Sequence, residues 1–378
     1  MPDHSRSLLR PSLVEMTDDA HCPYRLLVQT AAQFAGANTG GPECLVSLAL
    51  ALAAGLPSGC TSIFTGNRLP ASLRTDYPTF GTPLLAERGV EGREEQLLRA
   101  GDVLVLPEVD ACPEHLVARG VHVWIYQLGT SPACRRLRQG CRFLVHNFWL
   151  STQYGVNVSR DLVVRPPLNP THLAERGWHM LPSAQRADTV VINGHDLPSS
   201  ALAAIEAACE RVRLHRRDER RANIHAPHHL QERHDHRHHQ NVTCLVPRGY
   251  SKPALRRLMG TSKIVVAWCM RGSERLPLEA VTYRNVLLSN DCAVGSDDRD
   301  FPLPPQHRLA TAEAIGDAIE ALLTSPADYE EALRRQLRLR LLYLGLGAAS
   351  MAEEATMFLR GAREPLPPSE LGECRPRA

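Results

Sequence analysis

The chain has 378 residues, of which 43% are hydrophobic and 22% are charged, and its formal net charge is +2 at pH 7. This length exceeds one ordinary core and predicts two domains of roughly 150 to 200 residues each. The near-neutral charge excludes a bulk attraction to nucleic acid or to a membrane surface. The aromatic content of 5% gives no platform for stacking bases. We therefore expect a globular protein whose partner is a small molecule.

The cysteines and the hydropathy pattern indicate the cellular compartment in which the protein is expected. Eleven cysteines occur without a CxxC pair, and Cys44, Cys244 and Cys269 lie in apolar runs. This pattern and the odd count predict buried, reduced thiols. No apolar run approaches the ~20 residues of a membrane span, and no apolar segment preceded by positive charge begins the chain. The expected location is the cytoplasm.

The first half of the chain reads as alternating strands and helices. We treat residues 1–22 as a flexible segment and residues 23–175 as an N-terminal Rossmann-like domain. Short apolar runs separated by short helices are typical of βαβ units and a parallel sheet. The predicted strands are 24–28, 62–65, 103–106, 121–126, 143–145 and 162–164, with helices at 113–119 and 132–139, while 68–94 stays unassigned.

A glycine pair follows the first predicted strand. Gly40 and Gly41 precede Pro42, which suits the first position of a helix that we expect to run to about Ala54. Glycines let a ligand approach the backbone closely, and the amino end of a helix favours anions. The alternative is an ordinary strand-to-helix turn that binds nothing, and the loop by itself does not decide between them.

The second half repeats the alternation after a proline-rich stretch. We predict a C-terminal Rossmann-like domain at 183–345, followed by a helix and tail at 346–378. The predicted strands are 189–192, 242–246, 263–268 and 286–288, and the predicted helices are 199–212, 252–259, 311–323 and much of 329–361. The fold class is therefore α/β, with two doubly wound domains that face a cleft.

Residues 215–240 interrupt the second domain. This segment holds eight of the seventeen histidines together with many arginines. Its histidines could bind a transition metal adventitiously, but they show no fixed ligand spacing. We predict a disordered surface insertion.

Charge is concentrated at one turn of the second domain. Glu274, Arg275 and Glu279 follow the apolar strand 264–268 and precede the strand 286–288. In open α/β sheets, ligands bind outside the carboxyl ends of the strands. We therefore expect this turn to meet a ligand.

Three motifs together resemble the GT-B glycosyltransferases. They are the Gly40-Gly41-Pro42-Glu43 loop, the stretch Gly272-Ser273-Glu274-Arg275-Leu276-Pro277-Leu278-Glu279-Ala280, and the stretch Gly295-Ser296-Asp297-Asp298-Arg299-Asp300-Phe301-Pro302-Leu303-Pro304. The resemblance covers residues 24 to about 305, with the histidine-rich insertion as a departure. Within that family, the motifs resemble those of a bacterial-type group. It implies a nucleotide-sugar donor held by the second domain and an acceptor held by the first.

The resemblance assigns the donor site to Gly40, Gly41, Arg271, Glu274, Arg275 and Glu279. Glu279 would accept hydrogen bonds from a ribose diol, and Arg275 would neutralise the diphosphate. Many retaining members carry a second glutamate upstream of the first. This chain has Arg271 there, with Glu274 as the candidate substitute, so the stereochemistry stays open.

The expected acid–base groups lie at strand ends of the first domain. Glu108 and His146 are the predicted catalytic residues, with Asp110 as a further candidate; an inverting transfer would need one such base. For His146 a structural role at the strand end is the alternative. The aspartates at 297, 298 and 300 invite comparison with a metal motif, but we expect them to cap a turn or reach donor hydroxyls. No metal and no cofactor is expected beyond the nucleotide-sugar co-substrate.

The sequence thus predicts a hexosyltransferase-like enzyme acting on an unidentified acceptor. Two alternatives stay open: a catalytically degenerate relative kept for binding, and a sugar-nucleotide epimerase of the same fold. Neither the donor base and sugar nor the oligomeric state follows from the sequence.

Overall fold

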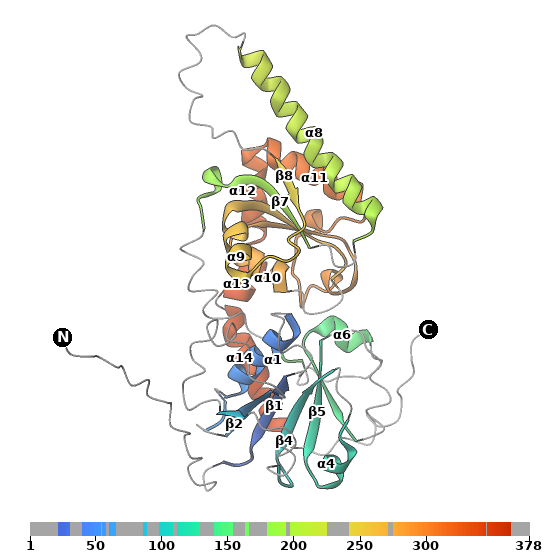
Figure 1. Cartoon of the computed structure of the whole chain (residues 1–378), viewed down its shortest axis with the longest axis vertical. Coiled ribbons are helices and arrows are strands. Elements are labelled where there is room, and N and C mark those ends of the chain that lie inside the picture. Colours follow the sequence, from blue (N-terminus) through green and yellow to red (C-terminus); the bar gives the residue numbers. More distant parts are fainter. Residues whose placement is uncertain are drawn as a thin grey trace, which may run out of the picture.

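Two parallel sheets organise the protein (Figure 1). The computed structural model describes residues 22–30, 40–53, 55–57, 60–65, 86–88, 98–108, 112–128, 140–153, 163–165, 180–193, 197–224, 242–270, 275–344 and 346–363. The first sheet has the strand order β3-β2-β1-β4-β5-β6, and every pair in it is parallel. Its strands are β1 Leu26–Thr30, β2 Thr61–Thr65, β3 Ala86–Arg88, β4 Val103–Pro107, β5 His122–Gln127 and β6 Arg142–Val145.

Most expected elements of the first half are confirmed. Strand β3 lies in the stretch that the sequence left unassigned, and the strand expected at 162–164 is reduced to one bridge between Val163 and Val145. The sequence did not predict the helix α6, Phe148–Gln153, which follows β6 directly. The helix expected at 132–139 lies outside the described residues.

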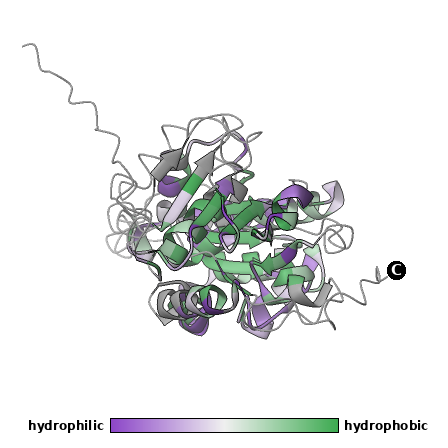
Figure 2. Cartoon of the chain, turned by 90° about the horizontal axis from the view of Figure 1, so that it is seen from below, coloured by the Kyte–Doolittle hydropathy of each residue, from purple (hydrophilic) through white to green (hydrophobic). Residues whose placement is uncertain are grey.

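The core of the first sheet explains why its strands are continuous apolar runs. All five residues of β4 are buried, because helices cover both faces of a parallel sheet. Helix α1, Gly40–Ala53, packs on one face, and the short helix α4, Glu114–Ala118, packs with the other buried cluster. Figure 2 shows these apolar residues gathered in the interior.

The second sheet has the order β10-β9-β7-β8 and is also parallel throughout. Its strands are β7 Ala187–Asn193, β8 Thr243–Leu245, β9 Ser262–Ala267 and β10 Val286–Ser289, and its helices are α8 Ser199–Ile224, α9 Lys252–Thr261, α10 Arg275–Thr282, α11 Ala312–Thr324, α12 Pro326–Arg335 and α13 Leu337–Leu344. Two buried clusters lie on its two faces. The predicted α/β class with two Rossmann-like units is confirmed.

A buried arginine fixes the amino edge of this sheet. The guanidinium of Arg186, 1% exposed, donates to the carbonyls of Leu181, Ser262, Tyr283 and Arg284 at 2.5 to 3.1 Å. Two of these carbonyls follow the end of α10, where the helix dipole favours a cation. Burial lowers the pKa of Arg186. No pattern in the sequence distinguishes this arginine from those on the surface.

The C-terminal helix returns to the first sheet. Helix α14, Leu346–Gly361, contributes Ala355 and Phe358 to the core that contains α1. The indole N–H of Trp124 donates to the carbonyl of Ala362 at 3.1 Å. The expected helix is therefore confirmed for these residues, and its partner is the first sheet. The domain boundaries given above stay predictions.

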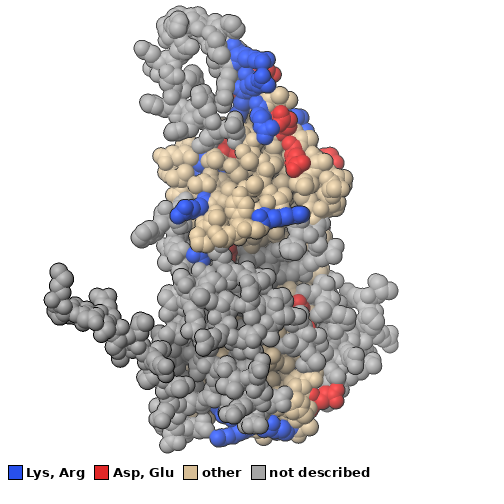
Figure 3. All heavy atoms as spheres, viewed as in Figure 1, with Lys and Arg blue, Asp and Glu red and all other residues tan. Residues whose placement is uncertain are grey.

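Helix α8 corrects one expectation. It runs to Ile224, so residues 215–224, which we expected to belong to a disordered insertion, are helical. Arg216 pairs with the carboxylate of Asp188 and donates to the carbonyl of Leu323 at 2.6 Å, which anchors this part of the helix. Basic side chains line the projecting end of α8 (Figure 3). Residues 225–241 lie outside the described residues.

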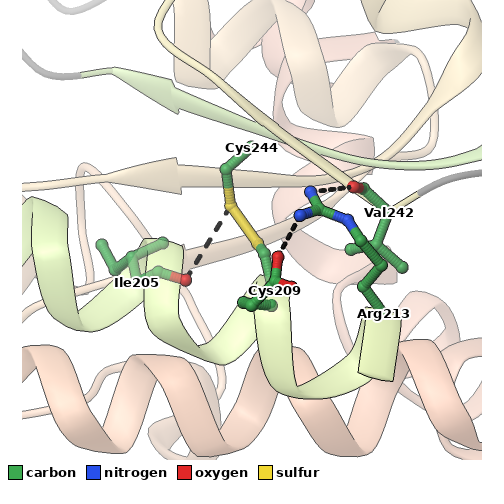
Figure 4. Close-up of a disulfide and its surroundings, with 6 residues drawn as sticks. Ile205, Cys209, Arg213, Val242 and Cys244 are labelled. Carbon is green, nitrogen blue, oxygen red and sulfur yellow. Dashed lines mark hydrogen bonds and ion pairs between the residues drawn. A yellow bond between two sulfur atoms is a disulfide. The ribbon is translucent and has the colours of Figure 1, made fainter. Parts of the chain in front are cut away.

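The expectation of reduced thiols is wrong for eight of the nine cysteines that the structure describes. Disulfides join Cys22 to Cys60, Cys112 to Cys141, Cys209 to Cys244 and Cys269 to Cys292, whereas Cys44 remains a buried thiol. Each pair is distant in sequence and close in the fold, so spacing gave no signal. Figure 4 shows how one of them joins α8 to β8. Disulfides persist in oxidising environments, so the cysteine argument for a cytoplasmic location no longer holds.

Candidate functional site

The carboxyl edges of the two sheets are turned toward each other. Helix α6 begins three residues after β6, and the turn η7, Ala293–Ser296, begins four residues after β10. These two elements are in contact, so the strand ends from both sheets meet in one region (Figure 1). Ligands of open parallel sheets bind at such strand ends.

Glu108 follows β4 and is oriented by the next strand. Its Oε2 accepts a hydrogen bond of 2.6 Å from the side-chain amide of Gln127 and one of 3.1 Å from the backbone N–H of Leu128. Gln127 is fully buried at the end of β5. The carboxylate is therefore fixed at the sheet edge, as a group needs to be when it takes a proton from a bound hydroxyl.

His146 follows β6 and is tied at both ring nitrogens. Its Nδ1 lies 3.0 Å from the carbonyl of Gln127 and must donate, since a carbonyl only accepts. Nε2 therefore accepts from the side-chain amide of Asn147 at 2.7 Å. The side-chain oxygen of Asn147 accepts in turn from the N–H of Leu150 in α6, at 2.7 Å. To take a proton, Nε2 would have to give up the bond from Asn147.

Gln127 joins the two predicted catalytic residues. Its side chain holds Glu108, and its carbonyl receives the N–H of His146. Sequence reasoning placed Gln127 only at the end of a strand. The signal in the sequence that could have found it is an amide side chain directly after the predicted strand 121–126, just as Glu108 follows 103–106.

Helix α1 begins at Gly40, so the glycine pair forms the first turn of the helix and not a loop before it. Because β1 and β2 are parallel neighbours, the helix between them begins at the carboxyl edge of the sheet. The N–H groups of a first helical turn have no partner within the helix. The expected position of Pro42 as the first helical residue is therefore wrong, since two glycines precede it in the helix.

The charged turn of the second sheet is described only in part. Helix α10 begins at Arg275 and connects β9 to its parallel neighbour β10. It therefore starts at the carboxyl edge of the sheet. Glu279 is half-buried in the second turn of this helix. Arg271 and Glu274 lie outside the described residues.

A network that the sequence did not predict joins the ends of β9 and β10. The N–H of Cys269 donates to the side chain of Asn290 at 2.6 Å, and the N–H of Val294 donates to the carbonyl of Met270 at 2.9 Å. The disulfide from Cys269 to Cys292 crosses the same two loops. The loop that leads to Arg275 is therefore held at its start by covalent and polar contacts.

The acidic motif is engaged with the protein itself. Asp297 accepts from the backbone and the guanidinium of Arg299, and Asp298 pairs with Arg308. Burial favours the protonated form of Asp297, but the hydrogen bonds from Arg299 outweigh it and hold its pKa below the ordinary value. The expectation that these residues cap a turn is confirmed for Asp297. Within the described ranges, no group of three or more His, Cys, Asp or Glu side chains is placed to hold a metal ion.

Comparisons with known proteins match the fold. No family model and no curated protein matches the sequence. A glycosyltransferase from Rickettsia africae ESF-5 superposes with a TM-score of 0.51 at 10% identity, covering 90% of this chain and 99% of that one. AviGT4, a glycosyltransferase involved in avilamycin A biosynthesis, gives 0.52 at 13% identity, covering 90% and 98%. The chain has a glycosyltransferase fold.

The match covers both sheets, since 90% of the chain is aligned. At this identity it shows the fold alone, and the GT-B motifs named above stay predictions. Among the helices in the described ranges, none combines the length and apolar character that crossing a membrane requires.

Proposed function

We propose that this protein transfers a hexose from a nucleotide-sugar to an acceptor. The donor binds at the carboxyl edge of the second sheet, and the acceptor binds at the carboxyl edge of the first. The observation that carries the proposal is the meeting of these two edges through α6 and η7, in a fold shared along 90% of the chain with glycosyltransferases.

The donor contacts are assigned to both sheets. Backbone N–H groups of Gly40 and Gly41 bind the diphosphate, because the amino end of a helix attracts anions. Arg275 neutralises the leaving phosphates, and Glu279 accepts from the ribose hydroxyls. Arg271 and Glu274 complete the donor side in this proposal.

Glu108 is the proposed base. The two hydrogen bonds to its Oε2 orient the carboxylate, which would take the proton of the acceptor hydroxyl as the hydroxyl oxygen attacks the sugar. His146 is assigned to hold Gln127 and Asn147 in place, since both of its nitrogens bind protein groups. The proposal includes no metal, and the pairing of Asp297 and Asp298 with arginines supports this.

A thermal-shift panel with UDP, GDP and their sugars tests donor binding. We expect one nucleotide family to raise the melting temperature, and the shift to disappear in Glu279→Gln. Glu320→Gln is the matched control, because Glu320 lies on α11 and pairs with Arg211 on the surface. A folded protein that responds to no nucleotide would refute the donor site.

A degenerate, binding-only relative is the second candidate. The occupied ring nitrogens of His146 favour it, because they remove one of the two predicted catalytic groups from direct chemistry. Donor binding without hydrolysis or transfer across a broad acceptor screen would support it. Conversion of the sugar nucleotide without any acceptor, followed by NMR, would instead identify an epimerase.

A further inference from the structure

The first turn of α6 is held by a carboxylate from the other half of the chain. Asp300, 2% exposed, follows β10 and accepts hydrogen bonds from the backbone N–H groups of Phe148 and Trp149, both at 2.8 Å. Helix α6 comes directly after His146 and Asn147. One side chain thus joins the strand ends of the two sheets.

The surrounding contacts converge on the same point. The Phe148 ring lies near two guanidinium groups, that of Arg165 at 5.7 Å and that of Arg299 at 4.9 Å. Arg165 is also paired with Glu354 of α14 at 2.5 Å and donates to the carbonyl of Arg299 at 3.4 Å. The first sheet, the motif after β10 and the returning C-terminal helix therefore meet around α6.

Asp300 is itself rigidly placed. Its N–H donates to the carbonyl of Asp297 at 3.1 Å, and the next residue, Phe301, is buried in the core of the second sheet. Trp149 packs against that same core. A shift of α6 relative to the second sheet would therefore break both bonds to Asp300.

We propose that Asp300 is a positioning residue, which fixes the turn between β6 and α6, and with it His146 and Asn147, against the second sheet. It thereby sets the separation between the acceptor side and the donor side. The functional part of this inference rests on the function proposed above. The contact itself does not depend on that function.

The ionisation of Asp300 adjusts this contact. Burial raises the pKa of Asp300 to about 7, against the backbone hydrogen bonds from Phe148 and Trp149 and the charge of Arg165. The ionised carboxylate accepts both N–H bonds, whereas the protonated group has one oxygen that must also donate. The charged groups that act on it are Arg165, Asp297 and Arg299. Glu354 is one step further away, paired with Arg165. We expect the contact to be tighter above neutral pH than below it.

Hydrogen exchange of the full-length protein tests the contact without any assay of activity. Protection of the Phe148 and Trp149 amides, corrected for intrinsic exchange at pH 6 and pH 8, is compared in the wild type, Asp300→Ala and Asp300→Asn. Asp298→Asn is the matched control, because that aspartate is in the same motif but pairs with Arg308 at the surface. Melting curves identify any variant that fails to fold.

We expect at least a tenfold loss of protection in Asp300→Ala, a smaller loss in Asp300→Asn, which keeps one acceptor oxygen, and no change in the control. The wild type should lose protection from pH 8 to pH 6, and Asp300→Asn should not. Unchanged protection in folded Asp300→Ala would overturn the inference.

Kinetics then separate positioning from a purely structural role. With an active donor and acceptor pair, Asp300→Ala should lower kcat at least tenfold while the KM for the donor changes less than twofold, since the donor contacts lie mainly in the second sheet. An equal change in both parameters would contradict positioning. If the wild type transfers nothing, the proposed function fails, whereas the exchange result still decides the contact.

Discussion

Glu108 and Gln127 form a hydrogen bond of 2.6 Å between the ends of two neighbouring parallel strands. With the bond from the Leu128 N–H, it fixes the orientation of the Glu108 carboxylate, the proposed base. We expect Glu108→Gln to lower kcat/KM by about 100-fold or more, the range for a lost general base. Gln127→Met, which leaves the bond from Leu128 in place, should cost about tenfold, or roughly 1.4 kcal/mol.

Both variants are measured with the donor found in the thermal-shift panel, and Glu320→Gln serves as the control. If Glu108→Gln transferred sugar at the wild-type rate, the base would have to be sought elsewhere. A loss in Gln127→Met as large as in Glu108→Gln would mean that Gln127 itself touches the substrate.

Glu279 is the residue proposed to bind the ribose of the donor. We expect Glu279→Gln to weaken nucleotide binding by about 1 to 3 kcal/mol, because a charged acceptor is replaced by a neutral one. Isothermal titration measures the effect. Arg275→Ala should lower turnover while changing the melting temperature little. Wild-type affinity in Glu279→Gln would place the ribose contact on another residue.

His307 should make the protein sensitive to acid. Burial, with a smaller contribution from Arg335, lowers the pKa of His307 to about 4. Its Nδ1 accepts from the side-chain amide of Gln336 at 2.7 Å, which requires the neutral ring. Between pH 6.5 and pH 4 only the unfolded chain binds this proton, so stability falls as the pH falls, by roughly 3 kcal/mol in all.

Urea unfolding at pH 4.5 and pH 7 measures this dependence. In His307→Gln the difference between the two pH values should shrink, because no proton binds at that position. Asp300 acts in the opposite direction, since its raised pKa makes the folded state bind the proton between about pH 4 and pH 7. An unchanged pH difference in His307→Gln would contradict the assignment.

The four disulfides among the described residues predict that the protein is sensitive to reductant. They close loops with sequence separations of 38, 29, 35 and 23 residues. Loop entropy gives about 3 to 4 kcal/mol for each. We expect dithiothreitol to lower the melting temperature, and non-reducing peptide maps to show the four pairs with Cys44 unbridged. Protein produced in an oxidising compartment that gave only free thiols would contradict the pairing.

Helix α8 ends at Ile224, and we expect the rest of the insertion, residues 225–241, to contribute neither to stability nor to nucleotide binding. Replacing residues 225–241 with a Gly-Ser linker of equal length should leave the melting temperature and nucleotide binding unchanged. Arg216→Ala should destabilise the protein by about 1 to 3 kcal/mol, because Asp188, whose side chain is 5% exposed, loses a charged donor and keeps Lys263 at 2.6 Å. A linker variant that unfolds would show that the segment is structural.

Local patterns in the sequence determined the βαβ order of the protein. Apolar runs such as 103–106 and 286–288 are buried strands because a parallel sheet is covered on both faces, and that requirement acts on neighbouring residues. The same reasoning placed Glu108 and His146 at strand ends. Helix α8 exceeded its expected end because pairing with Asp188 and Leu323, far away in sequence, supports its arginine-rich turns.

Only the tertiary structure decided which of these strand ends act together. Several contacts join residues that only folding brings together. Gln127 links Glu108 to His146, and Asp300 binds the amides of α6. Helix α14 returns to the first sheet, and the described disulfides join distant cysteines. Such contacts depend on distance in space, and composition and periodicity carry no information about it. The sequence by itself therefore determined the two sheets and the edges where chemistry is expected, and the contacts of α6 with η7 and Asp300 decided how those edges meet.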